Sequence, residues 1–131
     1  MRKLLPIASL VVVMAITACV NHATEVYNVE LSSYNTAEPL DAKKAERAIK
    51  TAGSKIGWQM DTIRPGLIRG TLNVRTHMAI IDISYDNERF SIDYVDSENL
   101  KYDEETNAIH KSYNKWIGIL ERRIRAEAAT I

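Results

Sequence analysis

The segment "LIRGTLNVRTHMAIIDISYDNERFSIDY" at residues 67–94 alternates between apolar and polar side chains with a period of two. This period is typical of β-strands that bury one face and leave the other in water. Val74 and His77 flank two intervening residues, and Tyr85 and Phe90 flank four. Both spacings keep the apolar row on one side of a hairpin, so the segment predicts three antiparallel strands joined by short turns.

A fourth strand is predicted just before this segment. Trp58, Met60 and Thr62 alternate with polar residues, and Pro65-Gly66 follows them. Proline presets φ and glycine allows a positive φ, so this pair is a strong turn signal. Residues 56–95 therefore predict a four-stranded antiparallel meander with one apolar face.

One helix is predicted on each side of the meander. Asp41 is suited to cap a helix at 40–52, and Gly53 is suited to end it. A longer helix at 108–128 repeats apolar residues at the spacing of one helical face. These residues are Ile109, Tyr113, Trp116, Ile117, Leu120 and Ile124. Two helices packed on one face of the sheet predict an α+β fold, a two-layer sandwich over residues 39–128.

The N-terminal residues have the pattern of a secretory signal. Arg2 and Lys3 precede an apolar run, and "ITAC" at 16–19 ends in the only cysteine of the chain. This motif resembles a bacterial lipobox, in which the thiol receives a diacylglyceryl group and the preceding peptide is removed. The resemblance implies a signal peptide at 1–18 and acyl chains on Cys19 that bind a membrane. Val20 in place of Asp favours the periplasmic face of the outer membrane.

Other locations stay open at this point. Ordinary cleavage would leave a soluble periplasmic protein, and different sorting would leave an anchor in the inner membrane. The apolar run at 4–20 is also near the lower length limit for a helix that spans a membrane. Residues 19–38 are polar and weakly patterned, so we interpret them as a lipidated N-terminus and tether. The alternation of Tyr27, Val29 and Leu31 allows a short edge strand within it.

The charge balance restricts the kinds of partner. The 131 residues hold 17 Lys or Arg and 17 Asp or Glu, and a signal peptide would remove Arg2 and Lys3. The remainder is slightly acidic, which argues against nucleic acid because phosphate binding needs clustered positive charge. A single cysteine also excludes an internal disulfide, so the fold must be stable without one.

Several fragments together resemble a family of small, uncharacterised Gram-negative lipoproteins. They are "AIKTAGSKIGW" (48–58), "RPG" (64–66), "RTH" (75–77), "ISY" (83–85), "FSIDYVDSENLKY" (90–102) and "IHKSYNKWI" (109–117). The resemblance covers roughly residues 40–125 and the lipobox. It implies the fold and the membrane anchor, and it implies no catalytic residue.

The polar face of the predicted sheet is the first candidate site. It presents Arg69, Arg75, Asp82 and Asp93 on the side opposite the apolar row. Opposite charges can pair across neighbouring strands. We interpret this face as a docking surface for another envelope protein.

The aromatic residues form the second candidate site. Tyr94, Tyr102, Tyr113 and Trp116 would line a cleft for a small ligand such as a lipid or glycan fragment, or else belong to the core. Buried tyrosine and tryptophan need hydrogen-bond partners for their polar groups. A ligand in a cleft or a neighbouring residue in the core would supply such a partner, so both roles stay open.

The histidines do not form a recognisable catalytic or metal motif. His77 and His110 could join Asp96 or Asp103 in a metal site or an acid–base pair, but no HExxH-type spacing is present. We interpret His77 as the start of a strand and His110 as the start of a helix. Their approach in the fold tests this interpretation.

Two charged segments are interpreted as solvent-exposed structure. The acidic stretch "DSENLKYDEETN" at 96–107 lacks the Gly and Glu of a calcium-binding EF-hand loop, where Lys101 and Asn107 stand. Arg122, Arg123 and Arg125 fall in the last turns of the second helix, where the helix dipole favours cations. Contact with anionic headgroups is the alternative role for these arginines, and we favour the interaction with the dipole. No catalytic residue, metal or cofactor is predicted.

These observations predict a non-enzymatic outer-membrane lipoprotein that serves as an interaction or structural module of the envelope. The alternative is a periplasmic module that binds a small ligand in the aromatic cleft. The catalytic possibility ranks third because no Ser-His-Asp order, nucleophile elbow or phosphate loop is present.

Overall fold

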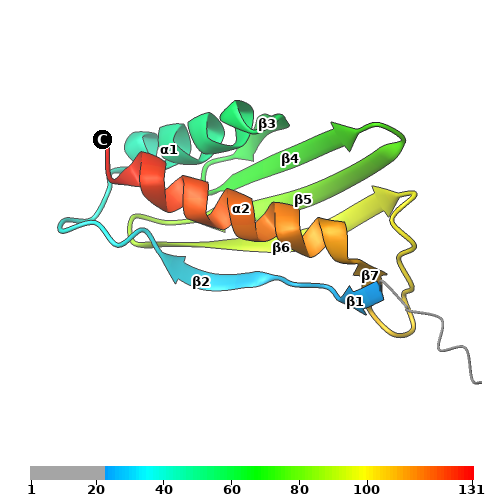
Figure 1. The fold of residues 1–131 in the computed structure, drawn as a ribbon. Helices are drawn as coiled ribbons and strands as arrows, with labels where there is room; N and C mark the ends of the chain where they lie inside the picture. The colour runs from blue at the N-terminus through cyan, green and yellow to red at the C-terminus, as the bar shows by residue number, and fades with distance from the viewer. Residues whose placement is uncertain (1–22) are drawn as a thin grey trace, which may run out of the picture.

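The computed structural model describes residues 23–131, which form seven strands and two helices (Figure 1). In chain order these are β1 (Ala23–Glu25), β2 (Val29–Ser33), α1 (Ala42–Lys55), β3 (Trp58–Arg64), β4 (Leu67–Val74), β5 (His77–Tyr85), β6 (Arg89–Glu98), β7 (Ala108–His110) and α2 (Lys111–Ala128). The α+β class predicted from the sequence is confirmed.

The meander from β3 to β6 is antiparallel, as predicted. Val74 lies opposite His77, and Tyr85 lies opposite Phe90, so both hairpin registers inferred from residue spacing are correct. Pro65 and Gly66 form the turn between β3 and β4, where Gly66 has φ +83°. Alternation and turn residues therefore specified the local pairing of neighbouring strands.

The main sheet has five strands, and the prediction of four was wrong. Its order is β2-β6-β5-β4-β3, and a second sheet pairs β1 with β7. The interpretation of 19–38 as a tether was also wrong for residues 23–38, because Val26, Val29 and Tyr34 are buried in the core. The alternation at 27–31 did mark an edge strand, although Leu31 is exposed at a register shift with φ +46°.

Helix α1 begins as predicted and ends later than predicted. The Asp41 side chain accepts a hydrogen bond from the Lys44 amide at 2.8 Å, which confirms the N-cap. Gly53 does not end the helix, which continues to Lys55 and is followed by Gly57 at φ +94°. Gly53 is instead buried against Met60 of β3.

Helix α2 begins at Lys111, three residues later than predicted. Residues 108–110 form strand β7, so the buried side chain of Ile109 belongs to a strand. The His110 side chain accepts a hydrogen bond from the Ser112 amide and caps the helix. The apolar face of α2 is otherwise as predicted, with Tyr113, Ile117, Leu120 and Ile124 buried.

Both helices cover the same face of the five-stranded sheet (Figure 1). The core between the two layers is apolar, with Ile68, Ile81, Ile83 and Ile92 fully buried on the sheet side. Neither helix lies on the opposite face of the sheet (Figure 1). Between residues 23 and 131, no helix has the length and apolar character needed to cross a membrane.

Candidate functional site

The uncovered side of the five-stranded sheet carries most of the charge of the strands. We call it the free sheet face. Its charged residues are Glu30, Asp61, Arg64, Arg69, Asp82, Arg89, Asp93, Asp96 and Glu98. Each is exposed or half-buried. Each alternates along its strand with residues that face the core, or lies opposite a residue whose side chain points away from the core. Six acids and three arginines make this face acidic.

A charged row crosses the strands of this face. Asp61 lies opposite Arg69, Arg69 opposite Asp82, and Asp82 opposite Asp93. Arg69 Nε and Nη2 donate to the two Asp82 carboxylate oxygens at 2.8 and 3.0 Å. The predicted pairing of opposite charges is thus present between β4 and β5. Because both side chains remain partly exposed, solvent screens the pair and it adds little to the stability of the fold.

Asp93 is an acid of this row whose negative charge is not balanced by an arginine or lysine of residues 23–131. Its burial and the nearby carboxylates of Glu30 and Asp82 raise its pKa above the ordinary value. Among residues 23–131, no Lys or Arg forms an ion pair with Asp93. Like charges directly opposite each other in a sheet are destabilising. The β6 side of the row therefore favours the approach of a cation.

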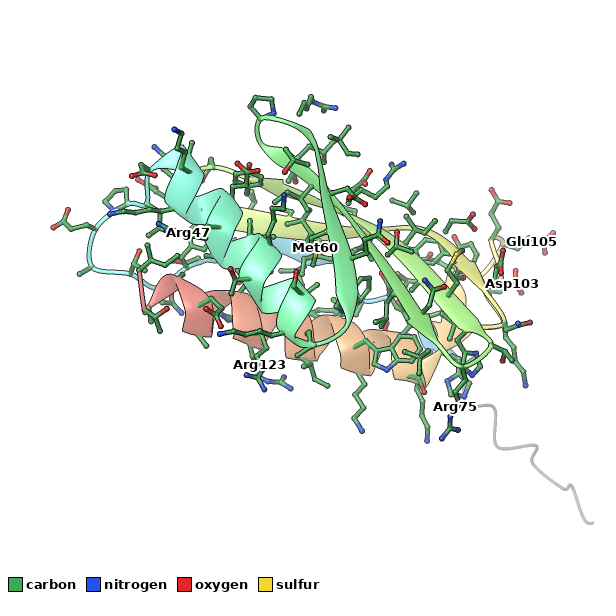
Figure 2. The ribbon with its side chains drawn as sticks, turned by 90° about the horizontal axis from the view of Figure 1, so that it is seen from above. Arg47, Met60, Arg75, Asp103, Glu105 and Arg123 are labelled. Atoms are coloured by element: carbon green, nitrogen blue, oxygen red, sulfur yellow. The ribbon has the colours of Figure 1, made fainter. Side chains whose placement is uncertain are left out.

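Arg75 does not belong to this row, although the sequence placed it on the same face. It occupies the two-residue turn between β4 and β5 with φ +56° and lies at the tip of that hairpin (Figure 2). The alternation of 67–74 continues through Arg75, although this residue stands in the predicted turn between Val74 and His77, where a side chain no longer belongs to one face of the sheet. Arg69, Asp82 and Asp93 remain as predicted members of the face.

Three of the four cleft aromatics contact one another. The ring centroids of Tyr94 and Tyr102 are 4.4 Å apart, and those of Tyr94 and Tyr113 are 5.6 Å apart with the rings edge to face. The Tyr94 hydroxyl shares a hydrogen bond with Ser97 at 2.7 Å. Tyr113 is fully buried, and its burial raises its pKa. Tyr113 thus belongs to the core, Tyr94 packs against it, and the exposed Tyr102 packs on Tyr94.

Trp116 lies in a different environment from the three tyrosines. It packs near His77, with ring centroids 6.5 Å apart, and lines an apolar hollow of about 200 Å³. The other lining residues are Ile56, Trp58, Leu72 and Ile119. Ligand pockets usually measure about 300–1,000 Å³, so this hollow is smaller than a typical site.

His77 and His110 lie at the same end of the fold, because they contact the backbone carbonyls of two consecutive residues, Asn99 and Leu100. His77 Nδ1 is 2.7 Å from the Asn99 carbonyl oxygen, and the His110 amide donates to the Leu100 carbonyl at 2.8 Å. His110 Nδ1 accepts from the helix backbone, so each ring has a structural role. Over residues 23–131, no group of three or more His, Cys, Asp or Glu side chains is arranged to hold a metal ion.

Three acids of the free sheet face were not predicted from the sequence. Glu30 falls in the segment interpreted as a tether. Asp96 and Glu98 were assigned to a loop, whereas β6 continues to Glu98 through a register shift opposite Ile80 and Ile81. The signal for this continuation was weak, since the shift interrupts the period of two.

Comparison with family models, curated proteins and solved structures gives no match to this chain. Cys19, the predicted lipidation site, lies outside the described residues.

Proposed function

We propose that this chain is a non-enzymatic envelope lipoprotein that docks a cationic segment of another envelope protein on its free sheet face. The observation that carries the proposal is the position of Asp93 directly opposite Asp82, beside Glu30. The outward side chains of a five-stranded sheet with no helix over them supply the area. The docking residues are Asp93, Asp82 and Glu30, with Arg69 fixing Asp82 from the β4 side.

A cationic partner fits this arrangement for an electrostatic reason. Arg69 already balances Asp82, so a Lys or Arg from a partner would meet Asp93 and Glu30 first. The incoming charge would replace a repulsion by an attraction. Such complementary charge mainly supplies specificity and a faster association rate.

The membrane anchor is proposed from the lipobox at 16–19 and the resemblance to small lipoproteins. In this proposal Cys19 carries the acyl chains, and Val20 favours the periplasmic face of the outer membrane. A single chain binds membranes only marginally, and the several chains of such a lipoprotein give a stable anchor. The intact mass of the protein purified from membranes tests this part, since a mature chain without acyl mass would contradict it.

The small-ligand alternative has less support. Trp116 packs near His77 and lines a small hollow whose lining includes none of the three tyrosines. The tyrosine rings are mutually packed. Docking of a protein therefore accounts for more of the observed surface than binding of a lipid or glycan fragment.

Photo-crosslinking in cells tests the docking surface. A photoreactive residue at Ser84 or Asn73 places the probe on the free sheet face without removing a charge of the row. The same probe at Glu104, which is exposed in the loop before β7, is the control. We expect one discrete adduct from the two sheet positions and none from 104, with Lys or Arg in the crosslinked peptide of the partner. No adduct from the sheet positions, or an acidic crosslinked peptide, would contradict the proposal.

A charge reversal makes the test specific for the row. Asp93→Lys should reduce the adduct about tenfold, which corresponds to roughly 1.4 kcal/mol of binding free energy. Glu104→Lys changes the net charge equally and should leave the adduct intact. Equal effects of the two variants would indicate that net charge, and not the row, controls binding.

A further inference from the structure

The two helices carry a charge opposite to that of the sheet. Together α1 and α2 hold ten Lys or Arg and three Glu, whereas the rest of residues 23–131 holds five Lys or Arg and fourteen Asp or Glu. The eight charged helix side chains that are fully exposed are all cations. The layer of helices is therefore strongly basic at its surface.

The three acidic residues of the helices are partly buried and add little negative charge to this surface. Glu46, Glu121 and Glu127 are each half-buried and each accept hydrogen bonds. Glu46 accepts from the Thr62 hydroxyl of β3, and Glu127 pairs with Lys55. Of the eight exposed helix cations, Lys55 is paired with Glu127, and the ion pairs within residues 23–131 leave the other seven without an acidic partner.

The cations of both helices point away from the sheet on one side. Lys111, Lys115 and Arg122 follow at intervals of four and seven residues, opposite the buried stripe of α2. Lys43 and Arg47 lie opposite the buried stripe of α1. Both helices bury their apolar residues on the same sheet face, so these cations share one outer surface. Arg123 also points outward from α2 (Figure 2). We call Lys43, Arg47, Lys111, Lys115, Arg122 and Arg123 the basic helical face.

The chain enters the fold next to this face. Ala23 of β1 lies opposite His110 of β7, and His110 is followed directly by Lys111, the first cation of α2. Cys19 precedes Ala23 by four residues, which span at most roughly 14 Å when fully extended. A lipid on Cys19 would therefore hold the start of α2 close to the headgroups.

We infer that the basic helical face lies on an anionic phospholipid surface and acts as a second attachment beside the lipid anchor. The inference rests on the lipid at Cys19 proposed above. Clustered Lys and Arg next to a membrane are attracted to anionic headgroups, and an acyl anchor joined to a basic patch binds more stably than either alone. In this orientation the free sheet face points away from the membrane toward its partner.

Site-directed spin labelling tests the orientation on the full chain purified from membranes. Cysteines replace Ala126, which is exposed on the outer side of α2, or Ser84 on the free sheet face. Neither replacement removes a charge. The protein is reconstituted in vesicles of phosphatidylcholine with or without phosphatidylglycerol, and a relaxing metal chelate is attached to the headgroups. We expect strong relaxation of the label at 126 and little at 84 when phosphatidylglycerol is present.

Salt and charge variants sharpen the test. In 1 M salt the Debye length falls to about 3 Å, so the difference between the two labels should disappear. Replacing Lys111, Lys115 and Arg122 by Glu should abolish it as well. The matched control replaces Arg64, Arg75 and Lys101, three exposed cations outside the helices, by Glu and should leave the difference unchanged.

Four outcomes would overturn the inference. They are equal relaxation at 126 and 84, stronger relaxation at 84, equal effects of the two triple variants, and broadening between labels that grows with protein concentration. The last result would assign the basic face to the acidic sheet face of a second copy. Failure of the anchor is distinguishable, because Cys19 would then appear as an additional labelled thiol and the acyl mass would be absent. Failure of the docking proposal would appear only in the crosslinking experiment.

Discussion

A Cβ atom added to Gly53 of α1 would lie 1.9 Å from the terminal methyl carbon of Met60 in β3 and 2.8 Å from its Cγ. The missing side chain lets the helix approach the first strand of the meander closely. Gly53 therefore has a packing role between the last turn of α1 and the edge strand β3, and the turn that ends the helix is supplied by Gly57.

Gly53→Ala should destabilise the protein by about 1 kcal/mol. The helix gains up to about 1 kcal/mol of intrinsic propensity, but the overpacking against Met60 costs about 1–3 kcal/mol. Urea unfolding of the single variants and of Gly53→Ala with Met60→Ala checks this, since the combined variant should lose less than the sum of the two. A stabilised Gly53→Ala protein would show that Met60 moves aside without cost.

Asp93→Asn should stabilise the protein by up to about 1 kcal/mol at pH 7, because it removes a like charge opposite Asp82. The pKa of Asp93 is raised in the folded state, so the folded protein holds its proton more tightly than the unfolded chain does. The penalty is therefore present above the folded pKa and disappears as the pH falls below the unfolded value near 3.8. Unfolding at pH 7 and pH 3 measures this, with Glu104→Gln as a control that has no effect.

Glu121→Gln should destabilise the protein by about 1–2 kcal/mol at pH 7. The Glu121 carboxylate accepts hydrogen bonds from Tyr27, Ser32 and Arg125 at 2.9, 3.1 and 2.6 Å, and so fastens the N-terminal strands to α2. Desolvation opposes ionisation of this group, but the three hydrogen bonds outweigh it and lower the pKa.

The lowered pKa of Glu121 fixes the sign of its pH dependence. Its contribution is fully present above the unfolded value near 4.5 and is lost as the pH falls through the lower folded pKa. The difference in unfolding free energy between Glu121→Gln and the unaltered protein should thus vanish in acid. A difference that is unchanged at low pH would contradict the role of the charge.

Two buried tyrosines should respond differently to loss of the hydroxyl. The Tyr34 hydroxyl donates to the Asp86 carbonyl at 3.1 Å, so Tyr34→Phe should cost about 1 kcal/mol. The Tyr113 hydroxyl is buried and has no hydrogen-bond partner among residues 23–131, so Tyr113→Phe should be neutral or slightly stabilising. Thermal unfolding of the two variants compares them directly, and a larger loss for Tyr113→Phe would reveal a partner for its hydroxyl.

Features that depend on neighbouring residues could be read from the sequence. The register of the two hairpins, the Pro65-Gly66 turn and the Asp41 cap all involve residues close along the chain. Alternation along a strand specifies which side chains share a face, so the membership of Arg69, Asp82 and Asp93 in the free sheet face was also predictable. These features follow from steric and hydrogen-bond preferences that act over a few residues.

Features that join distant segments could not be read in the same way. Strand β2 is short and pairs with β6 about 60 residues later, and β1 pairs with β7 across most of the chain. A three-residue strand at 108–110 is indistinguishable by period from the start of the helix that follows it. Long-range pairing is selected by burial of the whole core, for which no local pattern exists.

The sequence by itself determined the four strands of the meander, the buried faces of the two helices, and the membership of Arg69, Asp82 and Asp93 in the free sheet face. The tertiary structure decided which distant residues meet: Glu30 lies near Asp93, Glu121 accepts a hydrogen bond from Tyr27, and Trp116 packs near His77. It also gathered the cations of two helices, separated by the whole meander, on one surface. The physical reason is that side-chain periodicity is local, whereas the balance of charge and packing between faces depends on which distant segments share the core.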